Sequence, residues 1–240
     1  MLIIGILASI TVPAMKGMGQ ANRSAAAHRQ VLDDIALARL RAISDRAPVY
    51  LVFAPPWVNQ AFQLNPRTIP EMRQMSNLLS GAYTSYALVS TRRVGDQPGR
   101  RTPRYLTEWK SLPEGLLFAP YKLVTTTTNL ANEYSRSFMF RTDLPFPSSR
   151  SIARFQLPCI GFNPQGQLIS QRDEIITLAK GSVFVRRDSA GNPIRGQTPD
   201  FQLSPTVNQN LPAATQTNTY QFVRVNWLTG RAKVELPEFH

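Results

Sequence analysis

Two residue types from which many catalytic and metal sites are built are nearly missing from this sequence. Its 240 residues include one cysteine, Cys159, and two histidines, His28 and His240. A single cysteine excludes an intramolecular disulfide and a cysteine-based metal cluster. Two isolated histidines offer little material for a Ser/His/Asp or Cys/His nucleophile site. We therefore predict a non-enzymatic protein with no metal, no cofactor and no small-molecule substrate.

The short motifs that bind phosphate, dinucleotides, zinc or calcium, and the serine-hydrolase elbow, are also missing. Asp33 and Asp34 are adjacent on an expected helix, where neighbouring side chains point in different directions, so a solvated surface is predicted for both. Glu108 and Glu114 flank Trp109 and leave open an enzyme whose two carboxylates converge in a pocket. Surface positions are the simpler expectation for this second pair.

Acidic residues are scarce relative to basic ones. The chain has 15 Asp and Glu against 27 Lys and Arg, a formal net charge of +12. Such an excess attracts polyanions, including nucleic acid and anionic lipid headgroups, through long-range electrostatics. It indicates a class of partner and no specific one.

A long helix is predicted over residues 20–47, which contain neither glycine nor proline. Apolar side chains recur there at three- and four-residue steps, which is typical of a helix with one packed face; they are Val31, Ile35, Ala38 and Ala42. Pro48 ends the helix, because it lacks a backbone N–H donor and restricts the residue before it.

After Pro48 the pattern changes to short β-like runs separated by Pro, Gly, Asn and Ser, and it stays so to the end. Strands are predicted over residues 49–54, 85–93, 115–119, 137–141, 152–163, 167–171, 174–187, 219–228 and 231–236. Tight turns are expected at 163–166 and 228–230, and the polar stretches 121–136 and 188–216 are expected to be surface loops.

The first fifteen residues, MLIIGILASITVPAM, form an apolar run. The run is short of the roughly 20 residues that span a bilayer, and it lacks the basic segment that begins a secretory signal. We expect it to continue into the helix that follows, with a kink near Pro13 and Gly17. Residues 1–47 then form a membrane and assembly helix, and residues 48–240 form a β-rich globular head.

Several stretches resemble type IV pilins and type II secretion minor pseudopilins of the GspH/FimT group, including those of verrucomicrobial gene cassettes. They are IIGILASITVPAMKG, DDIALARLRAISDRAPVYLVF, EWKSLPEGLLF, IGFNPQGQLIS and VRVNWLTGRAKVEL. The family pattern begins with a leader, a cleavage-site Gly, a Phe and a Glu, and none of these precedes Met1. We therefore expect the chain as written to lack the leader and the first helix turns.

The resemblance implies an α+β fold: a long N-terminal helix, kinked near Pro13 and Gly17, packed on a mostly antiparallel, two-sheet, pilin-like head. It implies a minor pilin or pseudopilin, anchored in the inner membrane with its head in the periplasm and then assembled into a pilus or pseudopilus that could reach the cell surface. The partners would be other pilin or pseudopilin subunits, through the N-terminal helix. Residues of the membrane and assembly helix would be Leu2, Ile3, Ile4, Gly5, Ile6, Leu7, Ala8, Ile10, Val12 and Pro13.

The alternative is a minor pilin that binds DNA or another polyanion during DNA uptake. Gly230-Arg231-Ala232-Lys233 is similar to a Gly-Arg-x-Arg motif of FimT-like proteins, with lysine in place of the second arginine. A second basic run lies between residues 90 and 104, where a solvated loop that protects a sheet edge is the simpler expectation. Candidate polyanion-binding residues are Arg92, Arg93, Arg100, Arg101, Arg104, Arg224, Arg231 and Lys233.

Overall fold

The computed structural model describes residues 2–61, 69–93, 95–97, 99–124, 133–191, 193–194, 197–204 and 219–235, without the side chains of residues 2–21, 59 and 61. The helices in these ranges are α1 (Leu2–Ser44), α2 (Val58–Ala61) and α3 (Ile69–Ser80), with a 3-10 turn at Pro120–Lys122. The strands are β1 (Val49–Phe53), β2 (Ser85–Ser90), β3 (Arg104–Tyr105), β4 (Lys110–Ser111), β5 (Leu116–Phe118), β6 (Met139–Pro145), β7 (Arg154–Phe162), β8 (Glu174–Phe184), β9 (Asp200–Leu203), β10 (Tyr220–Val225) and β11 (Ala232–Glu235).

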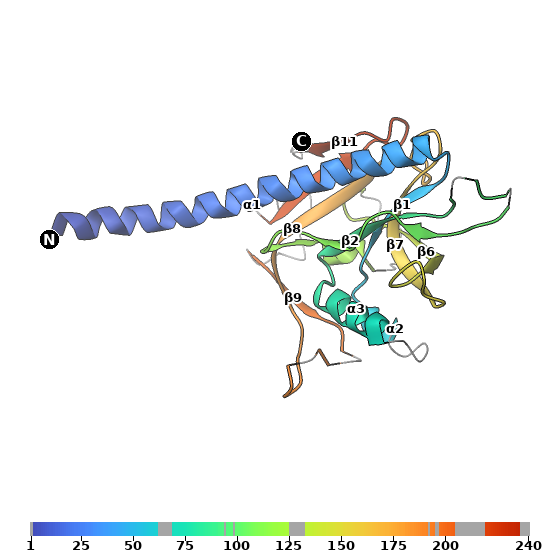
Figure 1. Ribbon diagram of the computed structural model, residues 1–240. Helices are drawn as coiled ribbons and strands as arrows, with labels where there is room; N and C mark the ends of the chain where they lie inside the picture. Colours follow the sequence, from blue (N-terminus) through green and yellow to red (C-terminus); the bar gives the residue numbers. More distant parts are fainter. Residues whose placement is uncertain are drawn as a thin grey trace.

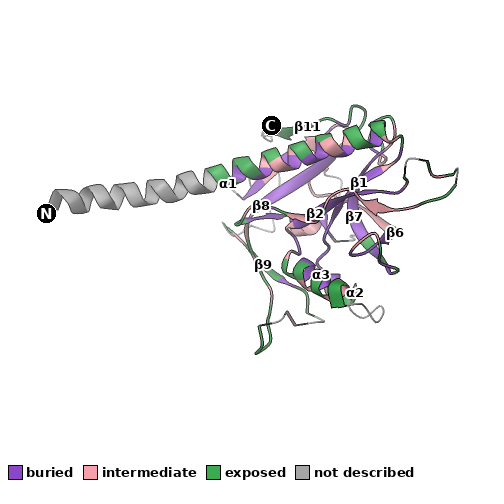
Figure 2. Cartoon of the chain, in the orientation of Figure 1, coloured by how far each residue is buried: buried purple, intermediate pink, exposed green. Residues whose placement is uncertain are grey.

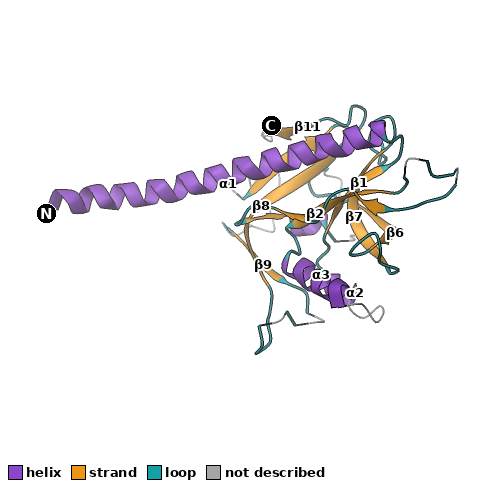
Figure 3. Cartoon of the chain, viewed as in Figure 1, coloured by secondary structure: helices purple, strands orange, loops and turns teal. Residues whose placement is uncertain are grey.

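The strands form two antiparallel sheets (Figure 3). The first has the order β3-β2-β1-β7-β6, with β4 also paired to β2. The second has the order β11-β10-β8-β5, with β9 also paired to β8. Antiparallel pairing fits the short connections and the alternating side-chain pattern of these segments.

Strand β1 lies in the middle of the first sheet, and both of its faces are covered. Val49, Leu51 and Phe53 point into a core shared with α1 and the second sheet. The alternate residues, Tyr50 and Val52, point into a second core that includes buried side chains of α3. Because side chains alternate between the two faces of a strand, all five residues are buried and the strand reads as a continuous apolar run.

Helix α1 packs on the body along its C-terminal half (Figure 2). The buried residues recur at helical spacing, as predicted, from Ala27 through Val31 and Ile35 to Ala42. The N-terminal part of the helix extends past the β-rich body (Figure 1). Within the described part of the chain, no helix is long and apolar enough to cross a membrane.

The predicted fold class, an α+β fold with a kinked helix on a pilin-like head, is wrong. The described chain is β-rich, with eleven strands in two antiparallel sheets, and the strands account for most of both cores. Helix α1 also continues through Pro13 and Gly17. Pro13 therefore does not end the helix, although a proline removes one backbone N–H donor.

The prediction of a solvated surface is also wrong for Asp34, although Asp33 is exposed. Asp34 is 4% exposed and accepts a hydrogen bond of 2.7 Å from the Tyr86 hydroxyl. The Lys110 ammonium lies 2.6 Å from its other carboxylate oxygen. A buried carboxylate is tolerated only with such partners, so Asp34 joins α1 to β2 and β4.

Most of the predicted strands are present with shorter boundaries, but the strand predicted over residues 137–141 begins and ends later, as β6. The short strands β3 and β4 were not predicted. Two further parts of the prediction are wrong. Residues 167–171 form no strand and contribute only an isolated bridge between Leu168 and Phe162. A helix, α3, occupies Ile69–Ser80 although helical periodicity was expected to end at Pro48. Of the two predicted surface loops, residues 125–132, 192, 195–196 and 205–216 lie outside the described residues, and residues 200–203 form β9.

Candidate anion-binding site

The loop that leaves β2 is organised around Asp96. The Arg93 backbone N–H donates to the Asp96 carboxylate at 2.8 Å, and the Arg92 guanidinium donates to the Asp96 carbonyl at 3.4 Å. The hydrogen bond from Arg93 holds the pKa of Asp96 below its ordinary range. Gly95 and Gly99 adopt positive φ values of 90° and 85°, a conformation that glycine reaches without strain.

A cleft of about 370 Å³ lies where this loop approaches the end of α1. Four of its eight lining residues are arginines, namely Arg46, Arg92, Arg100 and Arg101; the others are Pro48, Thr91, Gly99 and Pro164. None of the described residues that line the cleft is a carboxylate. Guanidinium groups offer planar, paired N–H donors that suit phosphate and carboxylate oxygens, so the cleft has the chemistry of an anion-binding site.

Arg46 is positioned by the way α1 ends. Its φ of 47° is left-handed, and the Ala47 N–H returns to the Ala42 carbonyl at 3.2 Å. This backbone reversal satisfies part of the helix terminus before Pro48. Sequence reasoning missed Arg46 as a site residue; the available signal was an arginine two positions before a helix-ending proline.

The arginines predicted in this loop differ in how much of their charge is already paired. Arg101 contacts Asp143 at 3.1 Å, but its side chain is 69% exposed and Asp143 is also held by Arg141. Arg104 does not line the cleft and pairs with Asp45 at 3.3 Å. Among the described residues, Arg46, Arg92, Arg93 and Arg100 form no ion pair.

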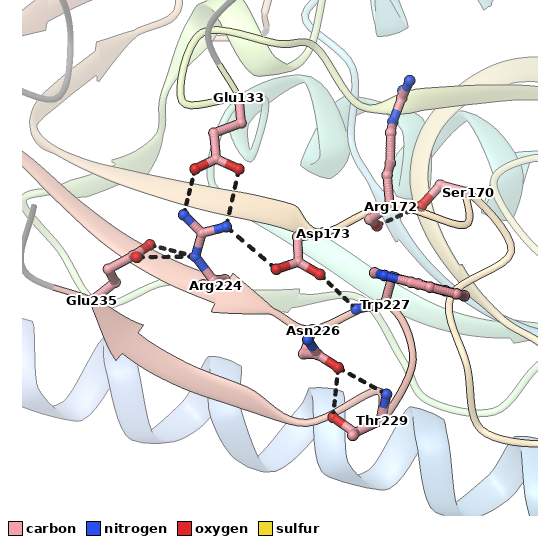
Figure 4. A network of polar contacts seen from close by, with 9 residues as sticks. All are labelled: Glu133, Ser170, Arg172, Asp173, Arg224, Asn226, Trp227, Thr229 and Glu235. Atoms are coloured by element: carbon pink, nitrogen blue, oxygen red, sulfur yellow. Dashed lines mark hydrogen bonds and ion pairs between the residues drawn. The ribbon is translucent and has the colours of Figure 1, made fainter.

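Arg224 was also predicted to bind a polyanion, but it lies among three carboxylates (Figure 4). Its guanidinium forms a paired contact with Glu133, with Nη1 to Oε2 at 3.0 Å and Nη2 to Oε1 at 2.5 Å. Nε lies 2.9 Å from both oxygens of Glu235, and Nη1 lies 3.3 Å from Asp173. The hydrogen bond with Glu133 raises the pKa of Arg224. Its donors are therefore used within the protein, and no phosphate ligand is expected there.

The predicted basic pair of the last hairpin, Arg231 and Lys233, is exposed on and beside β11. Lys233 lies directly opposite Arg224 in the β10–β11 pairing. Neither residue lines the arginine cleft. The structure thus brings together Arg92, Arg100 and Arg101, and leaves Arg93, Arg104, Arg224, Arg231 and Lys233 outside the cleft.

Two turns meet beside the cleft, and both lie in stretches that resemble the pilin family, IGFNPQGQLIS and VRVNWLTGRAKVEL. Gly166 and Gly230 have φ values of 79° and 63°, and a Cβ added to Gly230 would lie 2.0 Å from the Gly166 carbonyl oxygen. The Arg39 guanidinium donates to the Thr229 carbonyl at 2.7 Å, and the Leu168 N–H donates to the Trp227 carbonyl at 2.8 Å. These turns therefore position the end of α1, and their glycines are explained by this contact.

The remaining candidate residues show no catalytic arrangement in the described part of the chain. Cys159 is buried, and burial raises its pKa to about 12, so its thiol is protonated at neutral pH. Burial also lowers the pKa of His28. The described residues contain no group of His, Cys, Asp and Glu that could hold a metal ion. Among the described residues, Glu108 lines a cleft of about 700 Å³ that Glu114 does not line.

Comparisons with protein-family models, with characterised proteins and with solved structures find no match to this chain. The resemblance to pilins and pseudopilins therefore stays a prediction.

Proposed function

We propose that this chain is a non-enzymatic subunit that assembles with other subunits through its N-terminal helix, as a minor pilin or pseudopilin does. The observation that supports this is the extent of α1. The helix has 43 residues, about 65 Å at a rise of roughly 1.5 Å per residue, and its ribbon extends well past the body (Figure 1). A helix of this kind offers a surface that the β-rich body does not cover.

The sequence of this extension suits a helix partner. Residues 2–15 contain no charged side chain, and small residues recur at Gly5, Ala8 and Ser9. Small residues allow helices to approach closely, and apolar neighbours supply van der Waals contact. In this proposal the segment lies in the inner membrane before assembly, the body lies in the periplasm, and the helix later packs in a pilus or pseudopilus.

Disulfide crosslinking of single added cysteines tests the proposal. Because the native Cys159 is buried, it should stay unreactive. In the producing cell, Ile6→Cys and Ile10→Cys should give crosslinked species containing more than one subunit, visible on a non-reducing gel. Ala36→Cys is the matched control, since Ala36 is an exposed residue on the packed half of the same helix.

A charge in the extension should remove this assembly. Adding Leu7→Glu to the Ile6→Cys variant should abolish the crosslinks, because an unpaired carboxylate among apolar helices is strongly unfavourable. Equal crosslinking of Ile6→Cys and Ala36→Cys, or crosslinking that Leu7→Glu leaves unchanged, would contradict assembly through this segment.

A second function, binding of DNA or another polyanion, is favoured by the arginine cleft. Its described lining includes four arginines and no carboxylate, and Arg46 and Arg100 are exposed. Phosphate contacts release condensed counterions, so the affinity should fall with salt. In this proposal the cleft binds the phosphate backbone without reading its sequence.

Replacing Arg46 and Arg100 together by alanine should reduce the affinity for a fluorescein-labelled DNA duplex, measured by anisotropy over a salt series. Loss of two phosphate contacts should flatten the slope of log K against log salt by about 2, since each contact contributes roughly 0.9. Arg186→Ala combined with Arg187→Ala removes the same charge from another part of the chain. An equal change in both double variants would indicate a general charge effect and would contradict a site at the cleft.

A further inference from the structure

A second and larger cleft, of about 700 Å³, lies away from the arginine cleft. It is bounded by α3, by the segment from β3 to β4, and by the turn after β6; the lining residues that matter below are Gln74, Asn77, Tyr105, Glu108, Trp109 and Arg150. This volume falls within the range of roughly 300–1,000 Å³ that is usual for ligand sites. Nothing in the proposed function makes use of it.

Two aromatic rings in this cleft are fixed in place by their polar atoms. The Trp109 indole N–H donates to the Pro147 carbonyl at 2.9 Å, and the Tyr105 hydroxyl donates to the Pro145 carbonyl at 2.9 Å. The ring centroids lie 5.7 Å apart with an interplanar angle of 45°. Because the polar atoms are used internally, these two side chains offer a ligand mainly the carbon surface of their rings.

Polar side chains beside the rings carry no such internal bonds. Within the described part of the chain, Gln74, Asn77, Glu108 and Arg150 form no side-chain hydrogen bond or ion pair. Gln74 and Asn77 lie one turn apart on α3, so their amides occupy neighbouring positions on one helix face. Each amide group can donate and accept hydrogen bonds.

We propose that this cleft binds a neutral oligosaccharide built from hexoses with equatorial hydroxyls. Such a sugar presents a face of C–H groups, which matches the electron-rich faces of aromatic rings. Its rim of hydroxyls both donates and accepts, which matches the two amides better than a ligand of one charge sign would. The single carboxylate and single guanidinium of the lining balance each other, so the cleft has no excess charge to select an anion.

Isothermal titration of the full chain with cellohexaose and with chitohexaose tests this proposal. At least one of the two should bind, with saturation that the other probes of the series, inorganic phosphate and a Gly-Ser hexapeptide, do not reproduce. Gln74→Ala and Asn77→Ala should each weaken this binding about fivefold, the usual result of losing one hydrogen bond. The double variant should weaken it about twenty-fivefold if the two amides act independently.

Arg73→Ala is the matched control, because Arg73 is exposed on the same helix and does not line the cleft. The affinity of Arg73→Ala for the oligosaccharide should equal that of the unchanged chain. Circular dichroism of each variant should show unchanged folding, since Asn77 is exposed and Gln74 is only partly buried. The proposal is overturned if neither oligosaccharide binds at millimolar concentration, if phosphate or the peptide binds better, or if both amide variants bind like Arg73→Ala.

Discussion

Replacement of Gly230 by alanine is expected to lower the free energy of unfolding by about 3 kcal/mol or more, through backbone strain and overpacking together. Gly230 has a φ of 63°, where any other residue is strained. Its added Cβ would lie 2.0 Å from the Gly166 carbonyl oxygen and 3.0 Å from the Arg39 side chain. Because the nearest atom belongs to a backbone, the clash cannot be relieved by rotating a side chain. Urea denaturation followed by tryptophan fluorescence measures the loss.

Gly191→Ala separates the two causes of this loss. Gly191 also has a left-handed φ, 80°, but no heavy atom lies within 4 Å of the added Cβ. This variant should lose about 1 kcal/mol, from backbone strain alone. Equal losses in the two variants would contradict the close approach of the Gly166 and Gly230 turns.

The two turns could be predicted from the sequence, but the contact between them could not. Turn residues carry local signals, and both the Asn163–Gly166 turn and the turn that ends at Gly230 were predicted from them. That the turns touch each other and Arg39 depends on the pairing of strands that are distant in the sequence. No local pattern contains that information.

Local sequence patterns also predicted some helices and strands and missed others. β1 and β10 were predicted because a proline or a turn bounds each apolar run. The helix α3 was missed because its buried side chains, Met75, Leu78 and Leu79, are few and polar residues surround them. Its stability depends on the core beneath β1, so tertiary packing decides its conformation more than propensity does.

Burial of charged residues was the least predictable part of the structure. Helical periodicity places Asp34 beside the apolar stripe of α1, and the sequence alone gives no sign that Lys110 will lie within 2.6 Å of it. The same is true of Arg224, whose partners come from three separate segments. The basic loop, in contrast, was predictable as a run of arginines, and only the contribution of Arg46 to the cleft required the structure.

Arg224→Met is expected to lower the free energy of unfolding by about 3 kcal/mol at neutral pH, because it leaves three carboxylates without their shared cation. The Arg224 side chain is 16% exposed, and those of Glu133, Asp173 and Glu235 are 39%, 25% and 19% exposed. Partial solvation keeps the effect at the lower end of the range for buried pairs. Arg186→Met is the control: its partner is Asp200 at 3.3 Å, both side chains are more than 60% exposed, and the loss should stay under about 0.5 kcal/mol.

The pH dependence of this difference identifies its cause. Hydrogen bonding to Arg224 lowers the pKa of Glu133 in the folded protein, so its stabilising contribution is complete above the unfolded carboxylate pKa of about 4 and is lost as the pH falls through the lower folded value. The difference in the free energy of unfolding between the unchanged chain and Arg224→Met should therefore be smaller at pH 3 than at pH 7. A difference in the free energy of unfolding that is the same at pH 3 and pH 7 would assign the loss to packing. The Arg224 guanidinium also lies 5.9 Å from the centre of the Tyr134 ring. In that case Arg224→Lys, which keeps the charge and changes the shape, should be as destabilised as Arg224→Met.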